Sequence, residues 1–589
     1  MRIKNIGNAG TRRVVAELAR VWISLEGYKV WRLQLSQSPS LIVPVVLISR
    51  LVWAMLALLP SIASAQVQLD RFYPPVVHIG GETVVNAEGK FPTWPVEIVS
   101  DRDDVKIVVG KDSGQLTVNV STDVSPGVVW IRMLDSASAS KLVPLLIESI
   151  AATSEVEPNN KIIEATPVEL AAVVYGKLAK SNDLDTYRVK LKRGHTFVAS
   201  AVAHRLLRSP MDAVMQLVDG RGNVIVQADD DRGLDPQLVY EAADDAELFL
   251  RIFAFPEVAN STIGYAGAES FVYTIRLTSD AFVDHALPLV VPADHSSVKT
   301  VPHGWNLPPK LEVLRRGATT HSPIVNHLPS ALGWQWQTAI AHDAVMIDDG
   351  ESGSVAVAQS LPCIFSGHIT ARAEIDRIRF PVNASTRYEA VVHSRAHGFP
   401  LDSVLRVVNL ADGSEVVTND DLSREQYDAS VVFTPKVTGE FVLEISDLVD
   451  GHGPRHAYSV AIAEAIPSAD LSVAEDHFIV TAGSSVEIPI SIVRQNGFDQ
   501  ELTITAQSLP EGVVAESVVS QTKGETSKTV KLKIVADKAV VSQSSFQIVA
   551  SVAAPDASSH VGKFTAKYRL NEVIAIEDLW LTAVAAKIN

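Results

Sequence analysis

Two groups of aspartates carry the strongest chemical signal in this chain. Asp183 and Asp185 flank a single leucine, and Asp229, Asp230 and Asp231 form an uninterrupted run. Carboxylate oxygens are the ligands that Ca²⁺ prefers in proteins, and alternating acidic residues on a loop that leads into a strand can converge on one ion. We therefore predict a calcium site at these five aspartates. The alternative is a solvated acidic loop in which Asp185 caps a turn through backbone N–H groups.

The surrounding sequence does not supply the rest of a known calcium loop. The spaced glycine and terminal glutamate of an EF-hand are absent. Upstream, residues 157–160 read Glu-Pro-Asn-Asn. Proline fixes φ and asparagine side chains bond neighbouring backbone, so we predict a structural role for this segment rather than a role in binding.

No residue set predicts a catalytic centre. Residues 350–354 read Gly-Glu-Ser-Gly-Ser, which fails the spacing of a nucleophile elbow, and no His-Glu-x-x-His motif occurs. The single cysteine, Cys363, lies in an apolar run and is predicted to be a buried small side chain. With one cysteine, the chain cannot form an internal disulfide, so its stability must come from its hydrophobic cores.

The elements that must position these residues are strands. Apolar residues alternate with polar ones in many segments, for example at Tyr187, Val189 and Leu191 and again across residues 486–492. Period-two alternation is typical of strands that bury one face, as in antiparallel sandwiches. Asp-Gly pairs at 219–220 and 412–413 lie between such runs and predict hairpin turns. The sequence thus predicts an all-β fold of tandem antiparallel β-sandwiches, both jelly-roll-like and Ig-like.

One segment occurs twice, which indicates a modular array. The matched positions are Gly176 with Gly367, Asp185 with Asp376, Phe197 with Tyr388, and Asp212 with Asp402. The second copy begins near Asp349 and has lost the Glu-Pro-Asn-Asn segment. It keeps acidic or amide residues at places that correspond to the predicted site, namely Glu374, Asp376, Asn419, Asp420 and Asp421.

The repeated segment resembles the bacterial pre-peptidase C-terminal domain. The resemblance rests on Glu-x-Glu-Pro-Asn-Asn at 155–160, Asp-x-Asp-x-Tyr at 183–187 and Pro-x-Asp-Ala-Val at 210–214. The flanking segments resemble Ig-like modules, as in secreted planctomycete proteins. The resemblance implies β-sandwiches that accompany secreted peptidases or other hydrolases and serve in binding or export. Relatives of the domain in collagenases bind calcium, so the resemblance implies that this chain binds calcium as well.

The N-terminal segment predicts export. An apolar stretch from residue 41 is interrupted by Arg50 and ends in Ala63-x-Ala65, the pattern of a signal-peptidase site. The apolar core after Arg50 is too short to span a bilayer. We predict cleavage between Ala65 and Gln66 and a secreted, periplasmic or cell-surface protein. The alternative is an uncleaved anchor, which is the one case that would place the protein in a membrane.

The predicted organisation has six parts. They are a signal or leader segment at 1–65, an Ig-like domain at 66–150, a first repeat sandwich at 151–280, a small β-module or linker at 281–350, a degenerate second repeat sandwich at 351–466, and a C-terminal Ig-like domain at 467–589. Residues 281–350, rich in proline and histidine, are the least clear of these.

Charge and composition narrow the function. The net charge is −17, so nucleic acid and anionic membrane surfaces would repel the chain. We predict a non-catalytic binding or structural protein that recognises an extracellular polysaccharide, peptide or protein partner, with Ca²⁺ as the one candidate cofactor. Two alternatives remain at this stage. The first is an accessory or targeting component of a secreted peptidase or other hydrolase, and the second is a hydrolase whose site no motif reveals.

Overall fold

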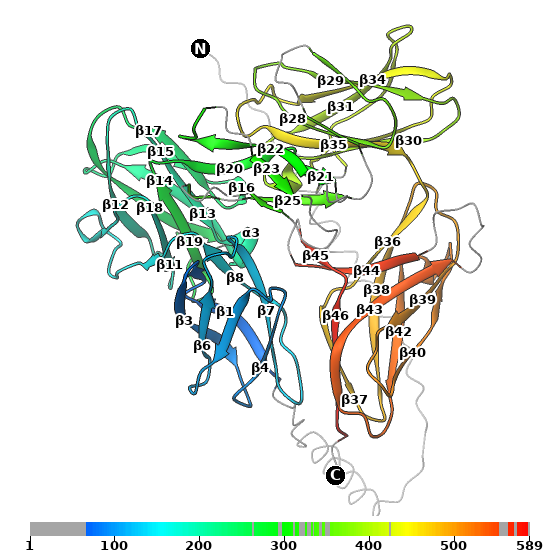
Figure 1. Cartoon of the computed structure of the whole chain (residues 1–589), viewed down its shortest axis with the longest axis horizontal. Helices are drawn as coiled ribbons and strands as arrows, with labels where there is room; N and C mark the ends of the chain where they lie inside the picture. Colours follow the sequence, from blue (N-terminus) through cyan, green and yellow to red (C-terminus); the bar gives the residue numbers. More distant parts are fainter. Residues whose placement is uncertain are drawn as a thin grey trace, which may run out of the picture. The chain divides into compact units, whose positions relative to one another are not determined.

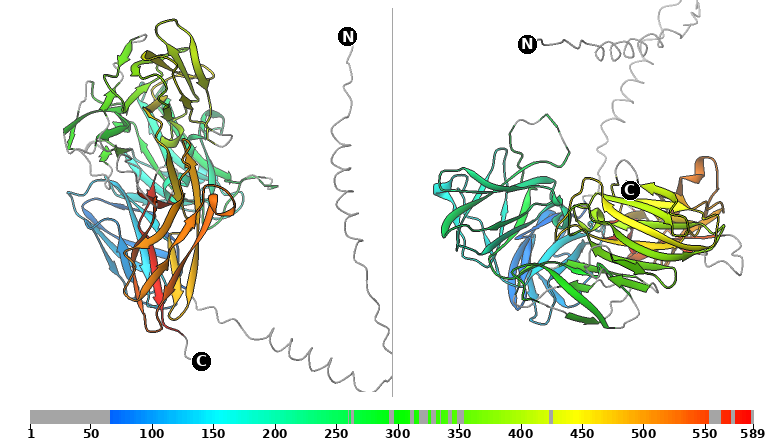
Figure 2. Two further views of the ribbon diagram at one scale, coloured as in Figure 1. Left: turned by 90° about the vertical axis from the view of Figure 1, so that its right-hand side faces the viewer. Right: turned by 90° about the horizontal axis from the view of Figure 1, so that it is seen from above.

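The computed structural model describes thirteen stretches of the 589-residue chain. They are residues 66–258, 260–261, 264–292, 297–309, 313–316, 324–326, 331–333, 335–340, 344–347, 354–422, 426–552, 563–570 and 574–586. The predicted leader with its cleavage site, and the start of the second copy at Asp349, lie outside them. Nearly all of the regular secondary structure in the described residues is strand (Figures 1 and 2), and α3 (His204–Leu207) is the one α-helix among them. The predicted all-β class of tandem sandwiches is confirmed.

In the described part of the chain, no helix has both the length and the apolar character needed to cross a lipid bilayer.

Residues 68–148 form a sandwich of two four-stranded sheets. One sheet has the order β1 (Gln68–Tyr73), β3 (Gly81–Lys90), β6 (Gln115–Val120), β5 (Val105–Val109). The other has the order β2 (Val76–His78), β8 (Val143–Glu148), β7 (Gly127–Leu134), β4 (Glu97–Ser100). Alternate residues of β6, namely Leu116, Val118 and Val120, are buried between the sheets, as the alternation predicts.

The first repeat is a sandwich of two five-stranded sheets (Figure 1). One sheet has the order β10 (Thr166–Pro167), β12 (Asp185–Leu191), β18 (Ala246–Pro256), β14 (Met211–Val218), β15 (Val224–Ala228). The facing sheet has the order β17 (Gln237–Glu241), β13 (Thr196–Val202), β19 (Val272–Thr278), β11 (Ala172–Lys177), β9 (Ala152–Ser154). Its core includes the fully buried side chains of Tyr187, Phe197 and Tyr273.

The second repeat has the same construction. One sheet has the order β27 (Val355–Val357), β29 (Asp376–Val382), β34 (Gly439–Asp447), β31 (Ser403–Asn409), β32 (Glu415–Asn419). The facing sheet has the order β33 (Ser430–Phe433), β30 (Tyr388–His393), β35 (Ala457–Glu464), β28 (Cys363–His368), β26 (Ala344–Ile347). Cys363 is 1% exposed, which confirms its predicted burial.

The two repeats match strand for strand. The edge strands β9 and β10 of the first repeat pair in parallel with their neighbours, and so do β26 and β27 of the second. The Asp-Gly segments at 219–220 and 412–413 join the antiparallel pairs β14–β15 and β31–β32, as predicted. An aspartate that accepts from three successive backbone N–H groups also recurs, buried in the first repeat and half-buried in the second. Asp235 accepts from the backbone N–H groups of residues 203–205, and Asp428 accepts from those of residues 394–396.

Residues 282–340 contribute two three-stranded sheets. One has the order β20 (Phe282–Leu287), β22 (Ser297–Trp305), β23 (Val313–Arg316), and the other has the order β21 (Val290–Pro292), β25 (Gln335–Ile340), β24 (Ile324–Asn326). The sheets correct one predicted boundary. Strand β26 falls within the predicted 281–350 module but pairs with β28 of the second repeat. It takes the place that β9 has in the first repeat, which sequence alternation alone does not reveal.

The C-terminal module is a connected set of eleven strands rather than two separate sheets. The main path is β37 (His477–Thr481), β46 (Leu579–Val584), β43 (Ser542–Val552), β44 (Lys563–Arg569), β36 (Ser468–Ser472), β38 (Ser485–Gln495), β42 (Thr529–Ala536), β40 (Val513–Glu516). Branching from it are β39 (Leu502–Gln507), β41 (Val518–Ser520) and β45 (Ala575–Ile576). The two layers join because β44 pairs with both β43 and β36.

Candidate functional site

The segment that leads into the first repeat lies against the loop before β12. The backbone N–H of Leu184 donates to Asn160 Oδ1 at 2.9 Å, and that of Thr186 donates to the Asn159 carbonyl at 3.1 Å. The Pro-Asn-Asn segment therefore has the structural role that its residue types predict. It also places Glu155 and Glu157 beside the loop that carries Asp183 and Asp185.

Three carboxylates meet at this place. Glu157, Asp183 and Asp185 each offer one oxygen, and these oxygens lie within 4.8 Å of one another. Asp183 and Asp185 are fully buried, whereas Glu157 is exposed, so the group is open to solvent on one side. We call Glu155, Glu157, Asn159, Asp183 and Asp185 the acidic cluster.

Several oxygens of the acidic cluster have no hydrogen-bond donor. Asp183 Oδ2 accepts from the Ala179 N–H at 2.7 Å, and Asp185 Oδ2 accepts from the Tyr273 hydroxyl at 2.5 Å. Asp183 Oδ1, Asp185 Oδ1 and both polar side-chain atoms of Asn159, its oxygen and its nitrogen, are buried without a partner. Buried polar atoms are nearly always satisfied in folded proteins, so these atoms are suited to contact with a bound cation or an ordered water.

Tyrosine hydroxyls form the floor of the acidic cluster. The Tyr273 hydroxyl lies 2.7 Å from that of Tyr187 and 3.3 Å from Glu155 Oε2. Gly176, on the neighbouring strand β11, leaves room for this network. A Cβ atom there would lie 2.4 Å from the Tyr273 hydroxyl oxygen and 2.5 Å from Glu155 Oε2. The repeated glycine is therefore explained by a close approach rather than by a turn.

Burial dominates the electrostatics of the acidic cluster. It raises the pKa of Asp185 to about 10, and the negative charge of Glu155 adds to the shift. Burial also raises the pKa of Glu155 above its ordinary value. Without a cation, Asp185 therefore holds a proton at neutral pH, because two unneutralised carboxylates cannot share so small a buried space.

The five predicted aspartates do not form one site. Asp185, Ile252, Met215 and Ala228 occupy one row across four neighbouring strands. Three inter-strand spacings of about 4.8 Å separate Asp185 from Ala228 by about 14 Å, and Asp229 follows Ala228. Asp229 and Asp230 are exposed, and Asp231 accepts from the Gln237 N–H at 3.0 Å. The prediction that these three join Asp183 and Asp185 was wrong.

Sequence reasoning also missed a member. The sequence predicts a structural role for Glu157, but its carboxylate lies with those of Asp183 and Asp185. Two acidic residues spaced i, i+2 at 155 and 157 were the available signal, and they repeat the spacing of Asp183 and Asp185.

The second repeat keeps the contact between a buried tyrosine and the first aspartate of the strand, but not the other members of the cluster. The Tyr458 hydroxyl donates to Asp376 Oδ2 at 2.5 Å, as Tyr273 does to Asp185. Glu374 instead accepts from the backbone N–H groups of Thr370 and Ala371, which belong to its own loop. Asn419 donates to the carbonyls of Asp421 and Ser430. The described residues around Asp376 thus form turns and strand ends rather than a second group of converging carboxylates.

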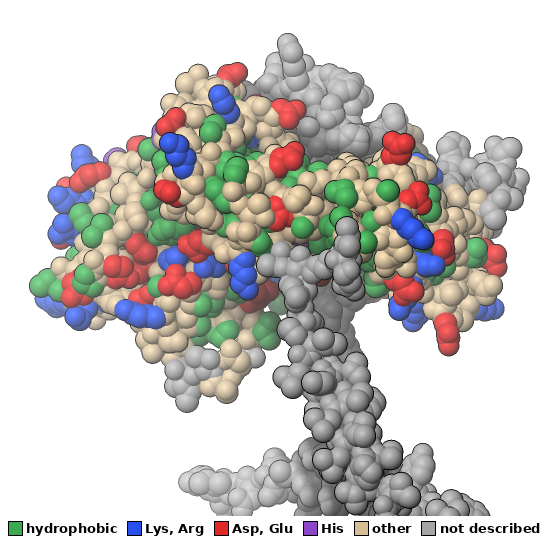
Figure 3. Space-filling model, turned by 90° about the horizontal axis from the view of Figure 1, so that it is seen from below, with side chains coloured by type: hydrophobic (Ala, Val, Ile, Leu, Met, Phe, Trp, Pro, Cys, Tyr) green, Lys and Arg blue, Asp and Glu red, His purple; other side chains and the backbone are tan. Residues whose placement is uncertain are grey.

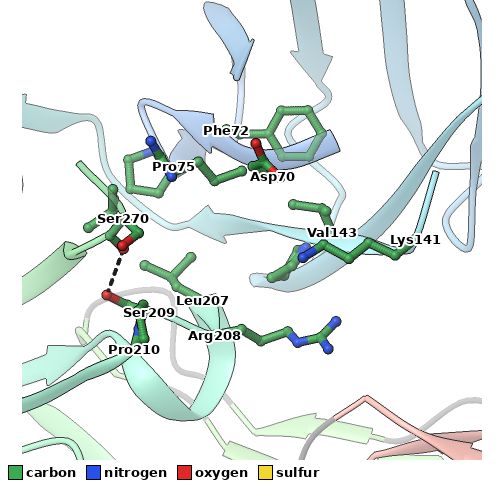
Figure 4. A pocket seen from close by; sticks show the side chains of 13 residues that line it. Asp70, Phe72, Pro75, Lys141, Val143, Leu207, Arg208, Ser209, Pro210 and Ser270 are labelled. Atoms are coloured by element: carbon green, nitrogen blue, oxygen red, sulfur yellow. Dashed lines mark hydrogen bonds between the residues drawn. The ribbon is translucent and has the colours of Figure 1, made fainter. Parts of the chain in front are cut away.

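A pocket of about 350 Å³ lies apart from the acidic cluster, between β1 and β8 on one side and the segment after α3 on the other (Figure 4). Its lining includes the basic side chains Arg71, Lys141 and Arg208 and one carboxylate, Asp70. Ser209 Oγ donates to the Ser270 carbonyl at 3.1 Å. None of the lining residues is a histidine or a cysteine, so the lining itself holds no imidazole to serve as a base for Ser209.

Comparisons with known proteins give no family. No family model matches the chain, and no curated protein matches it. Among solved structures, a periplasmic inhibitor of g-type lysozyme from Aeromonas hydrophila is 11% identical, covering 20% of this chain and 98% of its own with a TM-score of 0.14. The glucan-utilization protein SGBP-B of Bacteroides ovatus, in complex with a mixed-linkage heptasaccharide, is 10% identical, covering 67% and 73% with a TM-score of 0.12. The eight N-terminal Ig domains of Down Syndrome Cell Adhesion Molecule are 11% identical, covering 89% and 57% with a TM-score of 0.17. At these scores the similarities support no inference about the function of this chain.

The raised pKa of Asp185 predicts an unusual pH dependence in the absence of calcium. Between the ordinary value of 3.8 and about 10, the folded state holds a proton that the unfolded state has lost. This contribution to stability is complete below pH 3.8 and is lost as the pH rises toward 10, by up to about 1.4 kcal/mol per pH unit. In chelator, calorimetry at pH 5, 7 and 9 should show the first repeat weakening as the pH rises.

Asp185→Asn is the control for this pH dependence. The asparagine amide is close in shape to a neutral carboxyl group and does not titrate. The melting temperature of the variant should therefore change much less than that of the wild type between pH 5 and pH 9. Equal pH dependence in the wild type and the variant would show that Asp185 is not the titrating group.

Proposed function

We propose that this protein is a secreted or cell-surface, calcium-dependent binding protein. In this proposal the first repeat holds Ca²⁺ in the acidic cluster and presents an adjacent aromatic surface to an extracellular polysaccharide or protein. The convergence of the Glu157, Asp183 and Asp185 carboxylates, with Asp183 Oδ1 buried and without a donor, is the observation that carries the proposal. The export step rests on the predicted signal segment.

The donor set suits a hard cation. Glu157, Asp183 and Asp185 offer carboxylate oxygens, and Asn159 adds a buried amide oxygen, with no nitrogen or sulfur ligand among them. Both oxygens of Glu155 already accept hydrogen bonds, from the Lys177 N–H and the Tyr273 hydroxyl. Oxygen-only sets favour Ca²⁺ or Mg²⁺ over zinc or copper. Ca²⁺ accepts six to eight oxygens in flexible geometry, and water can supply some of them. The side of the cluster at the exposed Glu157 is open to solvent, so water can reach an ion there. A bound Ca²⁺ supplies the positive charge that these oxygens lack.

An aromatic surface lies next to the acidic cluster. Phe253 stacks on Tyr265 with ring centroids 4.2 Å apart, and Phe255 contacts both rings at 6.1 and 6.2 Å. Phe255 is 42% exposed, although a large apolar side chain gains by burial. Of the other two rings, Tyr265 is half-buried and Phe253 is buried beneath them. An exposed aromatic ring is suitable for stacking on a sugar ring or packing against a partner protein. We call Phe255 and Tyr265, with Phe253 as their support, the aromatic surface.

One residue joins the two features. The Asn182 N–H donates to the Tyr265 carbonyl at 2.9 Å, and the Tyr265 N–H donates to Asn182 Oδ1 at 3.2 Å. Asn182 directly precedes Asp183. A cation that fixes Asp183 therefore also fixes the loop that holds Tyr265, which couples calcium binding to the shape of the aromatic surface.

The charge of the chain limits the partner. The net charge of −17 disfavours polyanions such as nucleic acids. On the face drawn in Figure 3, acidic and basic side chains of the described residues are interspersed, and no continuous basic patch is visible there. A neutral polysaccharide, or a neutral or basic protein, fits this surface better than an acidic polymer.

Calcium should stabilise the first repeat. At one hundred times its dissociation constant, Ca²⁺ would add about 2.7 kcal/mol to the free energy of unfolding. Calorimetry of the full chain should show one transition that rises with calcium and falls with chelator. Asp185→Asn should remove this sensitivity, whereas Asp376→Asn, the equivalent change in the second repeat, should keep it. A calcium response that is equal in both variants, or absent from the wild type, would contradict the proposed site.

Ligand binding should depend on the aromatic surface. A glycan array of neutral polysaccharides, together with a panel of extracellular proteins, should yield a ligand whose affinity falls about tenfold in Phe255→Ala, a loss of about 1.4 kcal/mol. Val224→Ala, which removes another exposed apolar side chain from the same sheet, should leave the affinity unchanged. Chelator should weaken binding in the wild type. Binding that is indifferent to both Phe255→Ala and chelator would refute the proposed role of this surface.

A further inference from the structure

Three histidines from three strands meet outside the site described above. His285 lies on β20 and His303 on β22, and they are direct cross-strand partners in the antiparallel pair. His368 is the last residue of β28, in the second repeat. The ring centroids lie 5.1 Å apart for His285 and His303, 5.0 Å for His285 and His368, and 4.6 Å for His303 and His368. One ring nitrogen of each lies within 4.8 Å of the others.

The ring of His285 is held in one orientation by a carboxylate. His285 Nδ1 donates to Asp284 Oδ2 at 2.8 Å, which leaves the lone pair of Nε2 directed toward His368, whose Nε2 is 2.7 Å away. A carboxylate behind an imidazole is the usual outer partner of a metal-bound histidine, because it fixes the tautomer and makes the ring a better donor.

Asp284 is itself fixed from both repeats. Arg232 of the first repeat lies 2.6 Å from Asp284 Oδ1, and Arg455 of the second lies 3.4 Å from Oδ2. Burial alone would raise the pKa of Asp284, but the charges of these arginines hold it well below its usual range. Asp231, 4.0 Å from Arg455, supplies a second negative charge. Two arginines and two aspartates therefore balance around the histidines.

The contact between His285 and His368 places a proton where a metal would bind. Because His285 Nδ1 donates to Asp284, His285 Nε2 carries a lone pair, and it faces His368 Nε2. In the absence of a metal, His368 Nε2–H donates to His285 Nε2. A bound metal requires this proton to move to His368 Nδ1, a change of tautomer without net loss of a proton.

We propose that His285, His303 and His368 bind a divalent transition-metal ion, with zinc as the preferred ion, and so join residues 282–305 to the second repeat. Three imidazoles and one water complete a tetrahedral zinc site. Zinc–nitrogen bonds of 2.0–2.1 Å place the ligand nitrogens about 3.3 Å apart, so shifts of about 1 Å assemble the site from the present positions. All three ligands are nitrogens, so the site selects zinc over calcium and differs chemically from the acidic cluster.

The packing around the histidines supports a role in joining the two parts. Leu287, Leu289 and Val290 form a buried apolar cluster with Ile364 and Phe399 of the second repeat. The Leu289 N–H donates to Ser366 Oγ at 3.1 Å. His285 packs against the ring of Phe399 at 5.0 Å. The metal would thus sit beside an existing contact, where little motion is needed to form it.

Zinc titration of the tag-free full chain, with a chromophoric competitor, tests this proposal. The wild type should bind one zinc ion that excess calcium does not displace. His303→Gln and His368→Gln should each weaken binding by at least about 100-fold. His195→Gln, which removes an exposed histidine of the first repeat, should leave the affinity unchanged. Absence of zinc binding by the wild type, or wild-type affinity in either site variant, would overturn the proposal.

Cobalt spectroscopy keeps the test decisive if a glutamine variant fails to fold. Co²⁺ in the wild type should give the intense visible bands of a tetrahedral site. His303→Cys should retain the ion and add a thiolate charge-transfer band, which a merely structural histidine would not produce. Weak octahedral bands in the wild type, or a cysteine variant with no such band, would contradict the assignment.

Discussion

A carboxyl group buried at the start of the same strand is the constraint on which both repeats depend. Asp185 begins β12 and Asp376 begins β29, and in each repeat a tyrosine of the facing sheet donates its hydroxyl to that carboxyl at 2.5 Å. The contact joins the two sheets through the core, where an ionised carboxylate is costly unless it is neutralised. The first repeat adds Glu157 and Asp183 around its aspartate, whereas Glu374 of the second bonds its own loop. The aspartate–tyrosine contact that both repeats share connects the two sheets. The carboxylates that only the first repeat adds make that repeat suitable for a cation.

Buried ion pairs recur at several contacts between modules. Arg276 of the first repeat lies 2.5 Å from Glu148 of the preceding sandwich, and Arg132 lies 2.8 Å from Asp476 of the C-terminal module. Asp284 faces arginines from both repeats. Such pairs gain little net stability over apolar packing, but leaving one partner alone is strongly unfavourable. We infer that they favour one partner surface over others, and at Asp284 the same carboxylate contacts His285.

The sequence predicted the features that depend on neighbouring residues, namely the strands, their buried faces and the duplication. Alternating residues such as Ile488, Ile490 and Ile492 are buried on one face, and the duplicated motif became two sandwiches with the same strand order. Strand register decided the rest. The row from Asp185 to Ala228 separates the aspartate run from Asp183, although both are acidic. His285 and His368 are 83 residues apart, and His303 joins them across a pair whose register shifts between Val283 and His285. The sequence gives no sign of that register shift, so the pairing of His285 with His303 could not be predicted from it.

When Ca²⁺ binds the acidic cluster, we expect it to replace the proton at Asp185. Calorimetric titration of the full chain with calcium at pH 7, in two buffers of different ionisation enthalpy, measures this exchange directly. Because the pKa of Asp185 is raised to about 10, we expect binding of one calcium ion with release of about one proton, and no such release in Asp185→Asn. Calcium binding without proton release in the wild type, or the absence of binding, would contradict the account.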